Sequence, residues 1–126
     1  MLSPELLMGN PQAPTVLPDA EVQKALAFAV EEYNQQIKCR NYFKQLHLQK
    51  AFTQGDTRDE YHLKVEMIKT VCRKTRGRRM NYERIQRCQL PGGNPEKRLC
   101  YFKVSPRLPR NETLFTTVAC TLVATS

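Results

Sequence analysis

The chain has 126 residues, no tryptophan and a formal net charge of +8 at pH 7. This length predicts one domain, whose core is built mainly from Leu, Val, Ala, Phe and Tyr. No segment has the ~20 apolar residues that a membrane-spanning helix needs, and the N-terminus lacks the pattern of a signal peptide. We therefore expect no transmembrane segment and a mature, basic protein that is attracted to polyanions.

The cysteines of the chain indicate the cellular compartment in which the protein folds. There are five, and they are Cys39, Cys72, Cys88, Cys100 and Cys120. No C-x-x-C pair is present, which argues against a zinc or thioredoxin-type site, so we expect no metal and no cofactor. Spaced cysteines in a small basic chain are typical of disulfides in an oxidising compartment, which predicts a secreted, extracellular protein. The residues alone allow fifteen ways to pair four cysteines and leave one free.

An arm and a helix are expected at the start of the chain. Four prolines within residues 1–18 predict an extended N-terminal arm. Asp19 then offers an N-cap, and a stripe with helical spacing predicts a helix over Ala20–Gln36. The stripe consists of Val22, Ala25, Leu26, Ala29, Val30 and Tyr33.

Apolar and polar residues alternate after the helix, which predicts strands. We expect them at Tyr42–Phe52, Tyr61–Met67, Leu99–Val104 and Leu114–Val123. In the last strand, one face is expected to carry Leu114, Val118, Cys120 and Leu122.

Three loops connect the predicted strands. Gln54–Asp59 is typical of a hairpin loop, and Ser105–Asn111 of a turn. The basic stretch Arg73–Gly93 shows no sustained period, so we expect a long loop closed by a cysteine pair. Because one helix cannot bury its stripe alone, it should lie across an antiparallel sheet, which makes the fold class α+β.

These segments resemble the type 2 cystatins. Val22–Asn34 is similar to the single helix of that family and its Tyr-Asn ending, and Tyr61–Met67 with Thr70–Thr75 is similar to the strand that leads to the first family cysteine. The spacing of Cys100 and Cys120 also matches. The resemblance implies a cystatin-like domain over residues 19–126, with one long helix across a four- to five-stranded antiparallel sheet. It also implies the disulfides Cys72–Cys88 and Cys100–Cys120.

The resemblance implies a reversible inhibitor of papain-like cysteine proteases (cathepsins) and not an enzyme. Members of the family plug the active-site cleft with a wedge made of an arm that ends in Gly, a Q-x-V-x-G hairpin and a Pro-Trp hairpin. Apolar loop tips displace water from the cleft, and a rigid wedge loses little entropy on binding. The matching positions here are Leu7, Met8, Gly9, Gln54, Gly55, Asp56, Thr57, Arg58, Leu108 and Pro109.

This wedge departs from the family pattern in both hairpins. Asp56 places a charge where an apolar Val is expected, and Arg58 replaces the final Gly. Leu108-Pro109 replaces Pro-Trp, so the large aromatic anchor is missing. These changes weaken the inhibitory loops or leave a plain surface hairpin. Lys38 stands where some relatives carry a legumain-binding Asn, so that activity is not expected.

A basic cluster supports a different function, a non-inhibitory cystatin-fold protein that binds heparan sulfate or acidic membranes. The cluster consists of Arg73, Lys74, Arg76, Arg78, Arg79, Arg84 and Arg87. The alternative is an ordinary solvated loop. Nucleic acid is not an expected partner, because Tyr82 is the main aromatic residue in the span. A third hypothesis is a cystatin-fold protein that binds a receptor or another secreted protein.

Cys39, the two histidines and Asn111 are further candidate functional residues. Cys39 either bridges two chains into a dimer or remains a free thiol in a monomer, and we favour the monomer. A catalytic pair of Cys39 with His47 or His62 has no local motif to support it. Asn111 begins an N-x-T sequon and is a glycosylation candidate.

Overall fold

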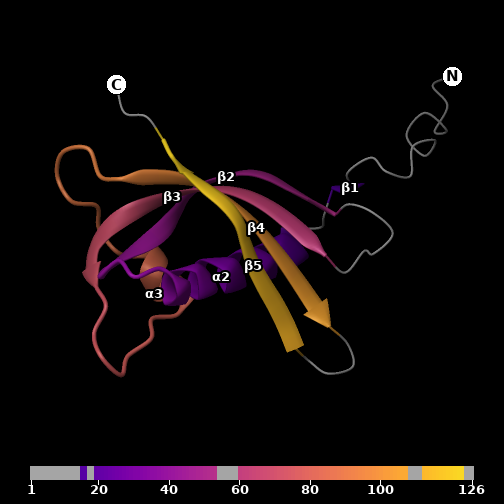
Figure 1. Ribbon diagram of the computed structural model, residues 1–126, viewed down its shortest axis with the longest axis horizontal. Coiled ribbons are helices and arrows are strands. Elements are labelled where there is room, and N and C mark those ends of the chain that lie inside the picture. The colour runs from indigo at the N-terminus through magenta and orange to yellow at the C-terminus, as the bar shows by residue number, and fades with distance from the viewer. Residues whose placement is uncertain (1–14, 17–18, 54–59, 108–111, 124–126) are drawn as a thin grey trace, which may run out of the picture.

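The structure is a computed structural model that describes residues 15–16, 19–53, 60–107 and 112–123. The elements are β1 (Thr15–Val16), α2 (Asp19–Gln36), β2 (Asn41–Thr53), β3 (Tyr61–Arg73), α3 (Tyr82–Gln86), β4 (Lys97–Arg107) and β5 (Glu112–Leu122). The strands form one antiparallel sheet in the order β1-β2-β3-β4-β5. The predicted α+β class, with one long helix on an antiparallel sheet, is confirmed (Figure 1).

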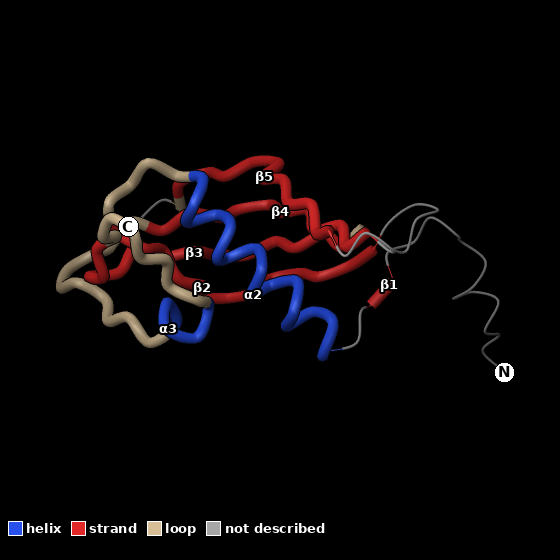
Figure 2. Tube along the Cα trace, turned by 90° about the horizontal axis from the view of Figure 1, so that it is seen from below, coloured by secondary structure: helices blue, strands red, loops and turns tan. Residues whose placement is uncertain are grey.

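Helix α2 crosses one face of the sheet diagonally (Figure 2). All six residues of the predicted stripe are buried, so the helical period identified the packing face correctly. The sheet covers this stripe with Phe43, Leu63, Val65, Met67, Cys100, Phe102 and Val104. Burial of this apolar surface stabilises the helix, which would be marginal alone.

Strand β4 runs farther than the sequence predicts. It continues to Arg107, and Pro106 stands in register with Thr113 in β5, so part of the expected turn Ser105–Asn111 is strand. Among the described residues, the pairing of β4 with β3 ends at Val104. Pro106 therefore lies at a local edge, where a missing N–H group is tolerated.

The predicted face of the last strand is wrong because β5 contains a register shift. Tyr101 pairs with Ala119 and Phe102 with Thr117, which places Val118 in a bulge. Before the bulge Phe115 faces the helix, with its ring 6.3 Å from that of Phe28. Leu114 and Val118 are consequently exposed, whereas Cys120 beyond the bulge packs against the core.

A short helix interrupts the expected loop Arg73–Gly93. Helix α3 begins after Asn81, whose side-chain Oδ1 accepts the amide of Arg84 at 2.9 Å. Ile85 is its only fully buried residue, so one helical turn carries no repeating apolar pattern. The expectation of a loop without secondary structure was therefore wrong at Tyr82–Gln86.

Two disulfides brace the sheet. Cys72 at the end of β3 is bonded to Cys88 after α3, and Cys100 in β4 is bonded to Cys120 in β5. These are the pairs that the family resemblance implies. Each bridge closes a short loop and is worth about 3 kcal/mol in the chain-entropy model.

A buried asparagine joins the end of α2 to the second residue after the start of β2. The Asn34 side chain accepts the Phe43 amide through Oδ1 and donates to the Phe43 carbonyl through Nδ2, both at 2.8 Å. Nδ2 also donates to the Val30 carbonyl at 2.8 Å. The side-chain amide thus satisfies both backbone polar groups of a strand residue in a buried place.

We expect Asn34→Ala to lower the free energy of unfolding by about 3 kcal/mol, because it leaves two buried backbone groups of Phe43 without partners. Chemical denaturation measures this change. The matched control is Gln35→Ala at an exposed helical position, which should change stability by about 0.5 kcal/mol or less. Equal effects of the two substitutions would contradict the role assigned to Asn34.

Candidate functional site

The strand register brings five strand ends together at one end of the sheet. Thr53 at the end of β2 pairs with Thr15 in β1 and with Tyr61 at the start of β3. Tyr61 pairs with Val104 in β4, and β4 and β5 continue as a pair beyond it to Arg107 and Glu112. Figure 1 shows these ends along the right side of the molecule, with α3 on the left. We call this the loop end of the sheet.

The predicted protease-binding residues are attached to this end but lie outside the described residues. They are Leu7, Met8 and Gly9 in the arm, Gln54, Gly55, Asp56, Thr57 and Arg58 after β2, and Leu108 and Pro109 after β4. The glycosylation candidate Asn111 also lies outside them. The described part of the candidate site therefore consists of the strand ends and the side chains beside them.

A polar and aromatic cluster lies beside the β2–β3 connection on the sheet face opposite the helix. The ring of His62 stacks on Phe52 with centroids 5.0 Å apart, and its Nδ1 is hydrogen-bonded to the Tyr101 hydroxyl. Its Nε2 lies 3.2 Å from Glu60, whose other oxygen is 3.7 Å from the Lys103 ammonium. Burial lowers the pKa of His62, and this effect outweighs the attraction of the Glu60 carboxylate.

Sequence reasoning placed His62 on a strand but missed this cluster. Its members come from three strands, β2, β3 and β4, and from the residue before β3, so their spacing along the chain gives no signal. The register of β3 on β2 places His62 opposite Phe52, and the register of β3 on β4 places it opposite Lys103 and next to Tyr101.

A hollow of about 490 Å³ lies on the helix side of the loop end. It is lined by the first turns of α2 and by β3, β4 and β5, through Glu21, Lys24, Ala25, Phe28, Tyr61, Val104 and Thr113. The Tyr61 hydroxyl donates to Glu21 at 3.3 Å across it. The lining is mostly apolar, with a charged rim from the helix.

We expect His62 to make stability fall as the pH drops. Its folded pKa is lowered, so the folded protein holds the neutral ring, whereas the unfolded chain takes up a proton near pH 6.5. The stabilising contribution is thus complete above about pH 7 and declines through pH 6.5 until the folded pKa is passed. Denaturant unfolding across this range measures it.

In the variant His62→Gln, the free energy of unfolding should decline less between about pH 7 and pH 5 than it does in the wild type. His47→Gln, at an exposed strand position, is the control and should follow the wild type. If His62→Gln and the wild type decline in parallel, His62 is not the group responsible.

The basic cluster lies at the other end of the sheet, and its members do not share one role. Lys74 is turned inward, where its ammonium donates to the carbonyls of Asn34 at 2.5 Å and Ile37 at 3.1 Å and so caps α2. Arg79 is paired with Glu32. The remaining five members are exposed, and they are Arg73, Arg76, Arg78, Arg84 and Arg87.

Three further observations concern Cys39, possible metal ligands and the helices of the described part of the chain. Cys39 is half-buried and unpaired there, at the C-terminal side of α2, whereas the contacts of the His62 ring are to Phe52, Tyr101 and Glu60. The described part contains no group of three or more His, Cys, Asp or Glu residues arranged to hold a metal ion. No described helix combines the length and apolar character needed to cross a bilayer.

Several known proteins are similar to this chain in sequence. The cystatin domain family model matches residues 12–107. Cystatin-1 of Crotalus adamanteus is 45% identical over 109 residues, which cover 86% of this chain and 78% of the relative. The cystatin of Naja kaouthia is 38% identical over 109 residues, covering 86% and 77%.

Solved structures show the same architecture. Dimeric human cystatin F superposes with a TM-score of 0.69 at 21% identity, over 91% of this chain and 90% of that one. The structure of Al-CPI gives 0.70 at 17% identity, over 88% and 97%. The family model, the snake relatives and the shared fold together show that this chain belongs to the cystatin family.

Proposed function

We propose that this protein is a secreted, reversible inhibitor of papain-like cysteine proteases, with cathepsins as the expected partners. The observation that carries the proposal is the convergence of β1, the β2–β3 ends and the β4–β5 ends at one end of the sheet. The segments that resemble the family wedge are continuous with these strands. Membership of the cystatin family supports the same function.

The mechanism we propose is a non-covalent plug of the active-site cleft. The arm at Leu7–Gly9 and the two connections at Gln54–Arg58 and Leu108–Pro109 enter the cleft together and displace water. The strands behind them are rigid, since the disulfide Cys100–Cys120 joins β4 to β5 and the Phe52–His62 stack lies beside the first connection. Preorganisation reduces the entropy lost on binding.

The altered loops determine how strongly we expect the protein to inhibit a protease. Asp56 and Arg58 bring charges into a connection that is apolar and glycine-terminated in the family pattern, and no tryptophan is present to anchor the second connection. We therefore propose that the arm contributes a larger share of binding here than the hairpins do. No catalytic group takes part.

We also propose an extracellular monomer. The two disulfides support an oxidising compartment. Cys39 is half-buried and packs against the core, so its thiol is less accessible to a second chain than an exposed one would be.

Titration of papain and of cathepsin L with the oxidised protein tests the inhibitory function. We expect stoichiometric, reversible inhibition by the wild type. The variant Met8→Asp with Gly9→Ala should inhibit at least tenfold more weakly, a loss of about 1.4 kcal/mol or more, because it brings a charge into the cleft and adds a Cβ where the backbone has to come close.

The control alters the same arm outside the motif, through Leu2→Asp with Gln12→Ala, and should inhibit like the wild type. If neither the wild type nor any variant inhibits at micromolar concentration, the inhibitor function is wrong for these enzymes. The non-inhibitory, polyanion-binding cystatin would then be the better account.

A further inference from the structure

A second hollow lies at the end of the sheet away from the loop end, and its walls are basic. It has a volume of about 520 Å³ and collects four arginines from three segments. Arg73 comes from the end of β3, Arg78 and Arg79 from the following turn, and Arg84 from α3. Thr75 and Tyr42 also line it, and none of the lining residues is acidic.

Three of these arginines have no carboxylate partner in the described part of the chain. Among the described residues, Arg79 is paired with Glu32, whereas no ion pair involves Arg73, Arg78 or Arg84. Like charges in one hollow repel each other, so an unneutralised set favours an anionic ligand. Arginine presents a planar fork of donors that matches sulfate and phosphate oxygens.

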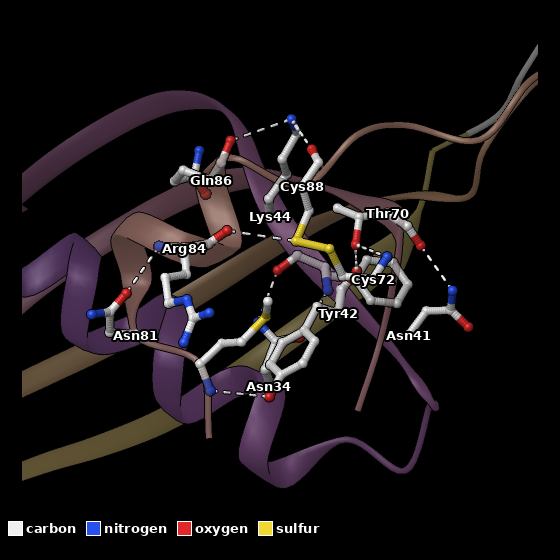
Figure 3. Close-up of a disulfide and its surroundings, with 12 residues drawn as sticks. Asn34, Asn41, Tyr42, Lys44, Thr70, Cys72, Asn81, Arg84, Gln86 and Cys88 are labelled. Atoms are coloured by element: carbon white, nitrogen blue, oxygen red, sulfur yellow. Dashed lines mark hydrogen bonds between the residues drawn. A yellow bond between two sulfur atoms is a disulfide. The ribbon is translucent and has the colours of Figure 1, made fainter. Parts of the chain in front are cut away.

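The segment that carries the arginines is fixed to the sheet. The Cys72–Cys88 disulfide ties its two ends together, and the Lys44 ammonium donates to the Cys88 carbonyl at 2.6 Å (Figure 3). The Gln86 side chain accepts the Gln45 amide at 2.8 Å and donates to the Gln45 carbonyl at 3.0 Å. The basic segment is therefore folded against β2 and β3.

A tight turn sets the spacing of the arginines within the segment. The Arg78 amide donates to the Thr75 carbonyl at 3.2 Å, and Gly77 between them has φ of +80°. A type II turn requires this left-handed conformation at its third position, where glycine fits without strain. Because the backbone that carries the arginines is fixed before binding, a ligand needs to order only their side chains, which reduces the entropy lost on binding.

The surroundings favour a sulfated polysaccharide over the other polyanions. Base stacking needs an exposed ring, whereas Tyr82 is half-buried with its hydroxyl donating to Gln45 at 2.6 Å. Insertion into a lipid surface needs an amphipathic helix with an exposed apolar face, whereas α3 has five residues and its Ile85 is fully buried. Sulfate groups along a glycan chain need only fixed cations.

We propose that the arginine hollow is a binding site for sulfated glycosaminoglycans of the heparin type. The proposal does not depend on protease inhibition. Strand β3 spans 13 residues from the loop end to Arg73, a contour of roughly 40 Å. A glycan in the hollow and a protease at the loop end can therefore be bound at once, which would hold an inhibitor at an extracellular surface.

The test measures binding of a size-defined heparin oligosaccharide to the oxidised full chain by calorimetry at about 0.15 M salt. The variant Arg78→Gln with Arg84→Gln removes two unpaired cations that line the hollow. The matched control is Arg76→Gln with Arg87→Gln, which removes two exposed cations of the same segment that do not line it. Both variants have the same net charge, and circular dichroism checks that both fold.

We expect the wild type to bind, the hollow variant to bind roughly tenfold or more weakly, and the control to lose much less. The desulfated oligosaccharide should not bind. Equal losses in the two variants would mean diffuse attraction by net charge and would overturn the site. Absence of wild-type binding would overturn it too. Tighter binding to phosphatidylserine vesicles than to heparin, with the same variant sensitive, would assign the hollow to lipid headgroups instead.

Discussion

The hydrogen bonds between Asn34 and Phe43 fix how helix α2 lies on the sheet. The side-chain amide of Asn34 accepts from the backbone N–H of buried Phe43 and donates to its carbonyl, both at 2.8 Å. Lys74 adds to the same joint by capping the last carbonyls of the helix. With the C-terminal end of α2 held there, its apolar stripe covers β3 and β4, and its first turn lies beside the loop end.

This arrangement gives one rigid sheet two separate ends with different chemistry. The loop end carries the mostly apolar hollow beside Phe28 on the helix face of the sheet and the buried Phe52–His62 stack on the opposite face. The opposite end carries a hollow lined by arginines, three of which form no ion pair with a described residue, on a segment closed by the Cys72–Cys88 disulfide. A wedge that fills a cleft needs apolar surface, whereas an anion site needs positive charge. The length of β3 separates the two, because salt screens interactions between exposed charges beyond about 8 Å at physiological ionic strength.

Much of the fold could be predicted from local patterns. The six residues of the helical stripe from Val22 to Tyr33 are all buried, because burial on one face imposes a period on the sequence. The stripe did not include Phe28 and Asn34, which also pack against the sheet. The alternation at Tyr61–Met67 located the first half of β3, which continues to Arg73. The bulge at Val118 could not be predicted, since it depends on the register between β4 and β5 and reverses the buried face without a local signal.

The sites were only partly accessible to sequence reasoning. A count of basic residues identified the cluster at residues 73–87 but treated its members as equal. In the structure the Lys74 ammonium donates hydrogen bonds to carbonyls at the end of α2, whereas Arg78 and Arg84 line the hollow. The His62 cluster and the role of Asn34 both depend on contacts between distant segments, and a polar residue at the end of a helix gives no sign that it will be buried.

We expect a bound protease to contact the loop end of the sheet and no other part of the protein. Hydrogen exchange of the protein, alone and bound to papain with a blocked catalytic cysteine, measures this. Exchange should slow in the arm and in the segments around Thr53, Tyr61, Arg107 and Glu112, with no change over residues 73–87. Protection centred on residues 73–87, or none at the loop end of a stable complex, would contradict it.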